Sequence, residues 1–219
     1  MNIYRIERET NSELRKLGRD FINTYHSYIK WSDRPARKLY WNLYENDNMV
    51  GVFALSNVFD KPKAVKEFMT KYKLNSNEIA NNIVYCLANC KNKNAGTIFL
   101  KLCRQDAIKW WYERYGDILK AFQTFILPPR TGAVYKADNW VQIGITAGQS
   151  QITRTISKTE YENNRDYYVK KGVKLQVYKN GEVRYLLHEF KETDKKLIFM
   201  KLNSDKEINK LLQNTNIII

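Results

Sequence analysis

Residues 128–144 hold the side chains best suited to chemistry on a nucleobase. An asparagine amide offers a donor and an acceptor to a purine edge, a tryptophan can stack on a base, and cations can hold phosphate. Gly132 permits the tight turn that would present them. The alternative is a well-formed turn with a tryptophan in the core. The candidates in this segment are Arg130, Tyr135, Lys136, Asp138, Asn139 and Trp140.

Tyr25 and His26 form a second candidate pair, at the end of a predicted amphipathic helix. An imidazole can take up or release a proton near neutral pH. A histidine at a helix C-terminus is also favoured by the helix dipole, so a capping or packing role stays open. The other histidine, His188, lies in a predicted strand, where we expect a structural role.

Cations and aromatic side chains alternate in a helix predicted at 97–115. Arg104 and Lys109 suit phosphate contact, and the aromatics suit base stacking. Trp111 and Tyr115 are four residues apart, on one helix face, so we expect these two to pack in the core.

Several well-defined sites are missing from the sequence. It has neither the G-x-x-x-x-G-K-[ST] phosphate loop nor the G-x-G-x-x-G dinucleotide motif. H-E-x-x-H is absent and neither histidine shares a helix face with a nearby acid, so no histidine-based metal site is expected. No G-x-S-x-G elbow supports a serine hydrolase.

Lysine and arginine outnumber aspartate and glutamate by 37 to 23, a net charge of +14 spread along the chain. Such a surface attracts polyanions, so the predicted partner is DNA. An anionic small substrate, or a basic surface without functional meaning, are the alternatives.

The three cysteines lack C-x-x-C spacing, and Cys86 lies in an apolar run, so buried free thiols are expected. Free thiols indicate a reducing compartment. The N-terminus has no apolar signal core, and no apolar run approaches the roughly 18–20 residues of a membrane span. The sequence therefore predicts a cytoplasmic protein that is neither secreted nor integral to a membrane.

Hydrophobic periodicity predicts an α/β (α+β) fold with a mixed central sheet flanked by helices. One domain is expected at 1–148, and a small β-rich extension with a helix and a hairpin at 149–219. Asn180 and Gly181 give the hairpin signal, and residues 149–172 are polar and expected to be partly helical. Strands are predicted at 2–6, 38–45, 50–58, 82–88, 119–127, 141–146 and 196–202, helices at 12–25, 62–73, 97–115 and 206–212, and a loop at 31–35.

Three features occur in order along residues 15–148. They are residues 22–29 with 40–44 and 50–54, the loop 92–96 before the long helix, and residues 124–128 with 132–144. The last has the form G-x-x-Y-x-A-x-N-W-x-x-x-G and is the most specific. Together they resemble the Mom-like DNA-modification family of phages and a related domain found with bacterial transposons and defence genes. Both are similar to the GNAT acyltransferase fold.

This resemblance implies a GNAT-like transferase that adds a carbamoylmethyl-type group to adenine in DNA. It places the site at Tyr25 and His26, at residues 92–97, and at Tyr135, Asn139 and Trp140. It also implies a phage or mobile-element protein in the cytoplasm of a bacterial host. An anti-restriction role would add a host defence protein as a partner.

Two positions depart from the family pattern. Acyl-CoA enzymes of this fold hold pyrophosphate with a glycine-rich loop at a helix N-terminus, whereas residues 91–96 contain one glycine. Acetyl-CoA is therefore expected to bind weakly or not at all. Mom-like chains carry an acid shortly after their Thr–aromatic pair; residues 127–129 replace it here, and Asp138 is the substitute. The candidate cofactor contacts are Asn92, Asn94, Gly96 and Thr97.

Three functions stay open at this point. The first is a base-modifying transferase, and the second is a catalytically silent DNA-binding or anti-defence protein of the same fold. The third is a GNAT-type acyltransferase acting on a small molecule or a protein. Residues 149–219 would form a subdomain, a homo-oligomer interface or a second nucleic-acid contact.

Overall fold

The computed structural model describes residues 2–26, 36–178 and 180–213, which form two compact units. The larger unit comprises Met1–Ile145 and Lys196–Ile219, and the smaller unit comprises Thr146–Lys195. The smaller unit is an insertion between two strands that are neighbours in the larger unit's sheet, β6 (Val141–Ile145) and β10 (Leu197–Leu202).

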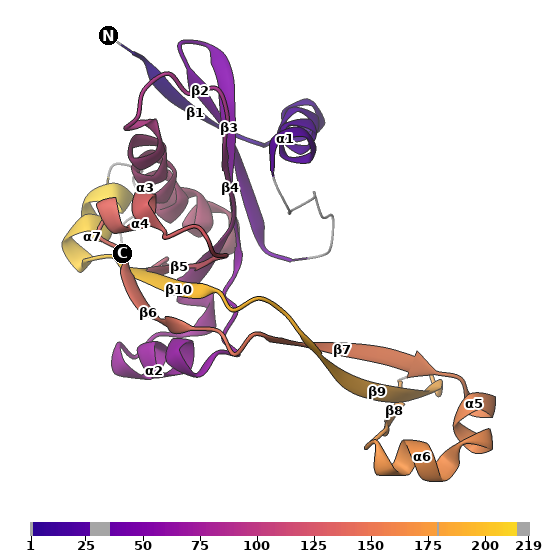
Figure 1. The fold of residues 1–219 in the computed structure, drawn as a ribbon. Helices are drawn as coiled ribbons and strands as arrows, with labels where there is room; N and C mark the ends of the chain where they lie inside the picture. The colour runs from indigo at the N-terminus through magenta and orange to yellow at the C-terminus, as the bar shows by residue number, and fades with distance from the viewer. Residues whose placement is uncertain (1, 27–35, 179, 214–219) are drawn as a thin grey trace. The chain divides into compact units, whose positions relative to one another are not determined.

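A seven-stranded mixed sheet is the framework of the larger unit (Figure 1). Its strand order is β1-β2-β3-β4-β5-β10-β6. Neighbouring strands are antiparallel, except that β4 and β5 are parallel. The remaining strands are β1 (Tyr4–Arg8), β2 (Lys38–Glu45), β3 (Asn48–Asn57), β4 (Ile79–Leu87) and β5 (Ala121–Ile126).

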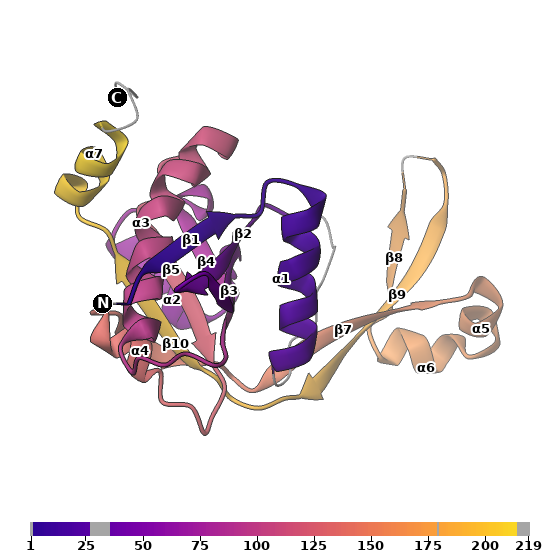
Figure 2. The same cartoon turned by 90° about the horizontal axis from the view of Figure 1, so that it is seen from above.

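Helices cover both faces of this sheet, as Figure 2 shows for α1 and α3. Phe21 and Ile22 of α1 pack on β3 and β4 from one side. The long α3 contributes Phe99 and Trp111 to the largest core cluster, on the other side. In the described part of the chain, no helix combines the length and the apolar content needed to cross a bilayer. The helices are α1 (Ser12–Tyr25), α2 (Lys63–Lys71), the 3-10 turn η1 (Ser76–Glu78), α3 (Ala95–Tyr115), α4 (Ala133–Ala137) and α7 (Asp205–Gln213).

Local sequence signals set the ends of these elements. The Asn11 side chain accepts a hydrogen bond from the Leu14 amide at 2.9 Å and so caps α1. α3 ends at Gly116, whose φ of 74° is left-handed. The β2–β3 turn places Asn46 and Asp47 at φ of 51° and 65°, a conformation that these two residue types tolerate best after glycine.

The predicted fold class, a mixed α/β sheet flanked by helices, is confirmed. Most predicted elements of the larger unit are present within a few residues of their expected bounds. Two segments differ: α4 forms where a turn was expected, and residues 149–172 begin with a strand, β7 (Gln149–Ile156). Long-range pairing with β9 (Val183–Glu192) makes this polar stretch a strand. The loop expected at 31–35 lies outside the described residues.

The C-terminal boundary of the insertion also differs from the expected division at 1–148 and 149–219. β10 returns to the larger sheet and lies between β5 and β6, with Leu197 opposite Ile126 and Met200 opposite Val141. Residues 196–219 therefore belong to the larger unit. This return could not be read from local periodicity, because the pairing partners are far away in the sequence.

The smaller unit is a three-stranded antiparallel sheet, in the order β7-β9-β8, with two short helices. The hairpin predicted at Asn180 and Gly181 joins β8 (Lys174–Val177) to β9. Ile156, Tyr168 and Leu187 form its small core. The helices are α5 (Lys158–Asn163) and α6 (Arg165–Lys170).

Glu9 is a buried acid beneath α1. It is 3% exposed, and neither carboxylate oxygen has a hydrogen-bond partner among the described residues. A Cβ at Gly18 would lie 1.9 Å from Glu9 Oε1 and 2.8 Å from Asn42 Oδ1, so a larger residue at this position would have to displace the Glu9 carboxylate. Burial raises the pKa of Glu9 to about 8, against a smaller opposing effect of Arg15.

We expect Glu9→Gln to remove a pH dependence of stability. Folded Glu9 keeps its proton up to a pKa of about 8, whereas the unfolded chain releases it near the ordinary 4.5. The folded state thus binds more protons between these values, and stability falls as pH rises through them, by up to about 1.4 kcal/mol per pH unit. Urea unfolding from pH 5 to 9 measures this. Glu13→Gln, an exposed acid of α1, is the control; parallel pH profiles for wild type and Glu9→Gln would contradict the expectation.

Candidate functional site

β4 and β5 separate after a short parallel pairing. The pairing runs from Ile79 opposite Ala121 to Asn82 opposite Thr124 and stops there. Both strands continue, but β4 remains paired with β3 up to Leu87, while β5 remains paired with β10 up to Ile126. A gap therefore opens between two strands that are adjacent in the sheet.

A β-bulge in β4 lies at the start of this gap. The register with β3 shifts between the pair Asn82–Leu55 and the pair Val84–Ala54. Ile83 is the extra residue between these pairs. A bulge bends its strand and increases the local twist, which turns β4 away from β5 at this point.

Beyond the bulge, alternate peptide groups of β4 face the gap. The Ala88 amide donates to Val50 O of β3 at 2.9 Å. Because hydrogen-bonding direction alternates along an antiparallel strand, the peptide groups of Tyr85 and Leu87 point away from β3. The pairing with β5 has ended before these residues, so β4 offers an open strand edge here.

The side chain of Asn82 holds the branch point together. Its Nδ2 donates to Ala54 O at 2.9 Å and to Val84 O at 2.7 Å. Its Oδ1 accepts from Tyr135 Oη at 2.6 Å, and Thr124 Oγ1 donates to the Asn82 carbonyl at 3.2 Å. These bonds fix the orientation of the amide, so its carbonyl oxygen faces the hydroxyl of Tyr135.

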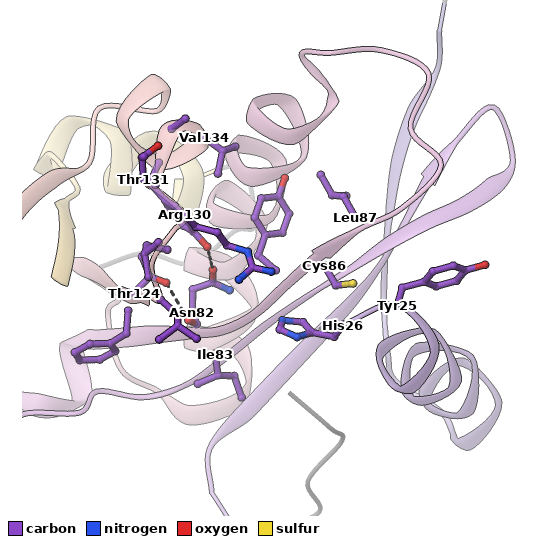
Figure 3. Close-up of a pocket in the computed structure, with 17 residues that line it drawn as sticks. Tyr25, His26, Asn82, Ile83, Cys86, Leu87, Thr124, Arg130, Thr131 and Val134 are labelled. Atoms are coloured by element: carbon purple, nitrogen blue, oxygen red, sulfur yellow. Dashed lines mark hydrogen bonds between the residues drawn. The ribbon is translucent and has the colours of Figure 1, made fainter. Parts of the chain in front are cut away.

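A cavity of about 470 Å³ lies at this gap (Figure 3), a size typical of small-molecule sites. Its walls come from β4, β5, the segment through α4, and the end of α1. The lining residues are Tyr25, His26, Asn82, Ile83, Tyr85, Cys86, Leu87, Thr124, Phe125, Ile126, Leu127, Arg130, Thr131, Gly132, Ala133, Val134 and Tyr135.

His26 is the lining side chain suited to accept a proton near neutral pH. Burial raises the pKa of the Cys86 thiol and raises the pKa of Tyr85 well above its ordinary value, so both stay protonated. Among the described residues that line the cavity, none is Asp or Glu. No group of three His, Cys, Asp or Glu side chains suited to a metal occurs in the described ranges.

The first turn of α3 lies beside the C-terminal half of β4. The Tyr85 hydroxyl donates to the Gly96 carbonyl. Asn92 shapes the preceding loop: its Oδ1 accepts from the Asn94 amide at 2.8 Å, and its carbonyl oxygen accepts from the Ala95 amide at 3.1 Å. One asparagine thus gives this loop its shape, without a run of glycines.

Four residues predicted from the sequence come together in the cavity: Tyr25, His26, Arg130 and Tyr135. They lie on two segments that are about 100 residues apart in the sequence, so the fold creates their proximity. The predicted cofactor residues Asn92, Asn94, Gly96 and Thr97 lie in and before the first turn of α3, next to the cavity but outside its lining.

Arg104, Asp138 and Trp140 form a buried network, which differs from their expected roles. The Arg104 side chain is 4% exposed and its Nε donates to Asp138 Oδ2 at 3.0 Å. Trp140 Nε1 donates to the same oxygen at 2.9 Å, and Arg104 Nη1 donates to Glu207 at 2.8 Å. In this position the Arg104 guanidinium is bonded within the protein and is not available to bind phosphate. Trp140 is buried and cannot stack on a nucleobase, and Asp138 is already paired with Arg104.

Asn139, Lys109 and Lys136 also lie outside the cavity. Asn139 lines a separate hollow of about 450 Å³ between α2 and strands β6 and β10. Its φ of 59° is left-handed, which gives a backbone reason for asparagine at this position. Lys136 Nζ lies 5.9 Å from the ring centroid of Phe199, and Lys109 is half-buried on α3.

The sequence analysis missed Asn82, Thr124 and Tyr85. Asn82 and Thr124 are buried polar residues in apolar strands. That pattern is itself a signal, because a buried amide or hydroxyl needs hydrogen-bond partners. Strand periodicity alone predicts Asn82 only as the first residue of a strand at 82–88.

No protein-family model and no curated protein matches the sequence. Solved structures do match. FeeM, an N-acyl amino acid synthase from uncultured soil microbes, has a TM-score of 0.49 at 8% identity and covers 100% of both chains. Arabidopsis thaliana NAA60 in complex with acetyl-CoA has a TM-score of 0.48 at 10% identity, over 86% of this chain and 98% of that one. A GNAT family acetyltransferase from Elizabethkingia anophelis with acetyl-CoA bound has a TM-score of 0.43 at 13% identity, over 91% and 98%. A likeness this distant concerns the fold and carries no argument about donor or acceptor.

We expect Asn139→Ala to lower stability by about 1–2 kcal/mol, because alanine is strained at a left-handed φ, and Asn139→Gly to recover most of this loss. Thermal melting of both variants measures the effect. Binding and activity at the main cavity should stay as in the wild type below the melting temperature. Loss of function in both variants with unchanged melting would instead place Asn139 in the site.

Proposed function

We propose that the larger unit transfers an acyl group from a phosphopantetheine thioester, such as acetyl-CoA, to an acceptor amine in the cavity. The observation that carries this proposal is the separation of β4 from β5 after Asn82 and Thr124. It leaves an open strand edge at Tyr85 and Leu87. Pantetheine is an extended chain with two amides, and such a chain can pair with an open edge as an added strand does.

The start of α3 suits the phosphate end of this donor. A helix N-terminus offers backbone amides and a partial positive charge to an anion. Gly96 and Thr97 lie in this first turn, and Lys91 and Lys93 add positive charge in the loop before it. The residues therefore fit both the arm and the phosphates. Binding of acetyl-CoA would differ from the weak binding that the loop sequence predicts. The reason is that two hydrogen bonds to Asn92 shape the loop, a role that glycines have in other acyl-CoA enzymes of this fold.

When bound, the donor supplies an activated acyl group as a thioester. Tyr135 is the candidate general acid, because its hydroxyl holds a proton at the branch point of β4 and β5. His26 is the candidate general base for the acceptor amine, because it lines the same cavity. Asn82 positions Tyr135 through its amide oxygen.

Modification of adenine in DNA has less support from this geometry. Asn139 and Trp140, which the Mom-like resemblance assigns to the site, do not line the cavity. DNA binding stays a prediction from the net charge of +14. A falling affinity for DNA with rising salt would support it, without deciding what the cavity transfers.

The proposal predicts that acetyl-CoA binds in calorimetry and that thiol release accelerates when amines are added. We expect Tyr135→Phe and His26→Ala to reduce turnover by roughly 10²–10⁴-fold, the usual contribution of an acid or base. Both variants should keep the acetyl-CoA affinity of the wild type. Tyr135→Phe should also lose about 1–3 kcal/mol of stability, because Asn82 Oδ1 loses its hydrogen-bond donor, so its turnover is measured well below its melting temperature.

Tyr167→Phe, which removes the hydroxyl of an exposed tyrosine in the smaller unit, is the matched control and should behave as the wild type. No binding of acetyl-CoA to the wild-type protein would contradict the proposal. So would full turnover in Tyr135→Phe, because the hydroxyl would then have no part in the reaction.

A further inference from the structure

Three buried oxygen atoms beneath α1 have no hydrogen-bond donor among the described residues. They are Oε1 and Oε2 of Glu9 and Oδ1 of Asn42. Glu9 Oε1 and Asn42 Oδ1 both lie within 2.8 Å of the point that a Cβ on Gly18 would occupy, so the two side chains are neighbours under the helix. Buried acceptors without a donor are costly. This arrangement therefore needs a proton that no neighbouring group supplies.

A proton on Glu9 itself provides the missing donor. The Asn42 amide is held in one orientation, because its Nδ2 donates to the Leu14 carbonyl of α1 at 3.0 Å. Its Oδ1 is left for Glu9, and a protonated carboxyl can donate to it. The proton then links the end of β1, through Asn42 of β2, to the first turn of α1. Without this proton, a carboxylate faces an amide oxygen in a site shielded from water.

The charges around Glu9 do not replace this proton. Burial raises the pKa of Glu9 to about 8, and the smaller opposing effect comes from Arg15 on α1. Arg15 is exposed, so water and salt screen its charge. Arg5 and Glu7 of β1 form an ion pair with each other at 3.4 Å. Strand alternation places the ionisable neighbours of β1 and β2 on the same face as Glu9; they are Arg5, Glu7, Tyr40 and Tyr44.

α1 has a small share of the core. Its buried residues are Gly18, Phe21 and Ile22, and the two apolar ones pack in a cluster with residues of β3 and β4. The largest cluster, on the α3 side of the sheet, includes no residue of α1 among its described members. Elements with few buried apolar contacts open before the rest of a domain. The sheet and α3 can therefore stay folded when α1 separates from them.

We propose that α1 responds to pH: it separates from the sheet when the Glu9 carboxyl loses its proton, while the sheet and α3 stay folded. The inference concerns the hold of the sheet on α1 and is independent of the acyl transfer proposed above. It has a consequence for the cavity, because Tyr25 and His26 at the end of α1 belong to its lining. A rise in pH would remove these two side chains from the cavity before the domain unfolds.

The direction of the pH dependence follows from the two states of Glu9. With α1 separated, water reaches the carboxyl and its pKa returns to the ordinary 4.5, against about 8 with α1 in place. The closed state thus holds one more proton between these values. Separation becomes easier as pH rises through them, by up to about tenfold per pH unit, and levels off above about pH 8.

Cysteine labelling beneath α1 tests this inference. Val52 is fully buried in the same cluster as Phe21 and Ile22. It is opposite Asn42 in the β2–β3 pairing, so Val52→Cys places a thiol under α1. The natural Cys103, fully buried in the cluster on the α3 side, reports unfolding of the domain. Dilute N-ethylmaleimide labels the thiols that opening exposes, and peptide mass spectrometry gives the rate at each cysteine relative to glutathione at the same pH.

We expect the relative rate at Val52→Cys to rise by roughly 30- to 50-fold from pH 6 to pH 8, with Cys103 still protected. Glu9→Gln keeps a donor for Asn42 and cannot ionise, so it should remove this rise. Glu13→Gln, an exposed acid of α1, is the control and should keep it. Ala54→Cys, a second fully buried position of the same cluster, repeats the measurement independently of Val52.

Three results would overturn the inference. An equal rise in the Glu9→Gln background would show that another group titrates. A relative rate that does not change with pH would show that α1 stays in place when Glu9 ionises. Equal acceleration at Val52→Cys and Cys103 would show that the whole domain opens, and not α1 by itself.

Discussion

The side-chain amide of Asn82 fixes the point at which β4 and β5 part. It donates to the carbonyls of Ala54 and Val84, the pair that follows the bulge, and accepts from the hydroxyl of Tyr135. A buried amide has few ways to satisfy all its groups, so these bonds select one geometry. The open edge of β4, the mouth of the cavity and the place of Tyr135 all depend on this residue.

Residues of the segment 132–144 contribute partly to the cavity and partly to the core. Tyr135 faces the cavity, while Asp138 and Trp140 join Arg104 in a buried network that ties α3 to the end of α4. Asn139 takes the left-handed turn between them. Packing and backbone geometry therefore explain why most of these residue types occur in this motif. Tyr135 is the member that faces the cavity and can take part in the reaction.

Local patterns in the sequence were enough to predict most elements of the larger unit, because periodicity, the cap at Asn11 and the turn at Asn46 are local signals. They also singled out Tyr25, His26, Arg130 and Tyr135. Pairing between distant strands was not predictable in this way. The return of β10 between β5 and β6, and the strand character of residues 149–156, both follow from such pairing. The burial of Arg104 was not predictable either, because its partners Asp138 and Glu207 are far away in the sequence.

In the proposed function, the edge of β4 beyond Asn82 binds the arm of the donor. Residue-resolved hydrogen–deuterium exchange by NMR, with and without saturating acetyl-CoA, measures this binding at single amides. We expect slower exchange at the amides of Tyr85 and Leu87, which point into the gap, and little change at Cys86, whose amide faces β3. Unchanged exchange at Tyr85 and Leu87 with acetyl-CoA bound would contradict it.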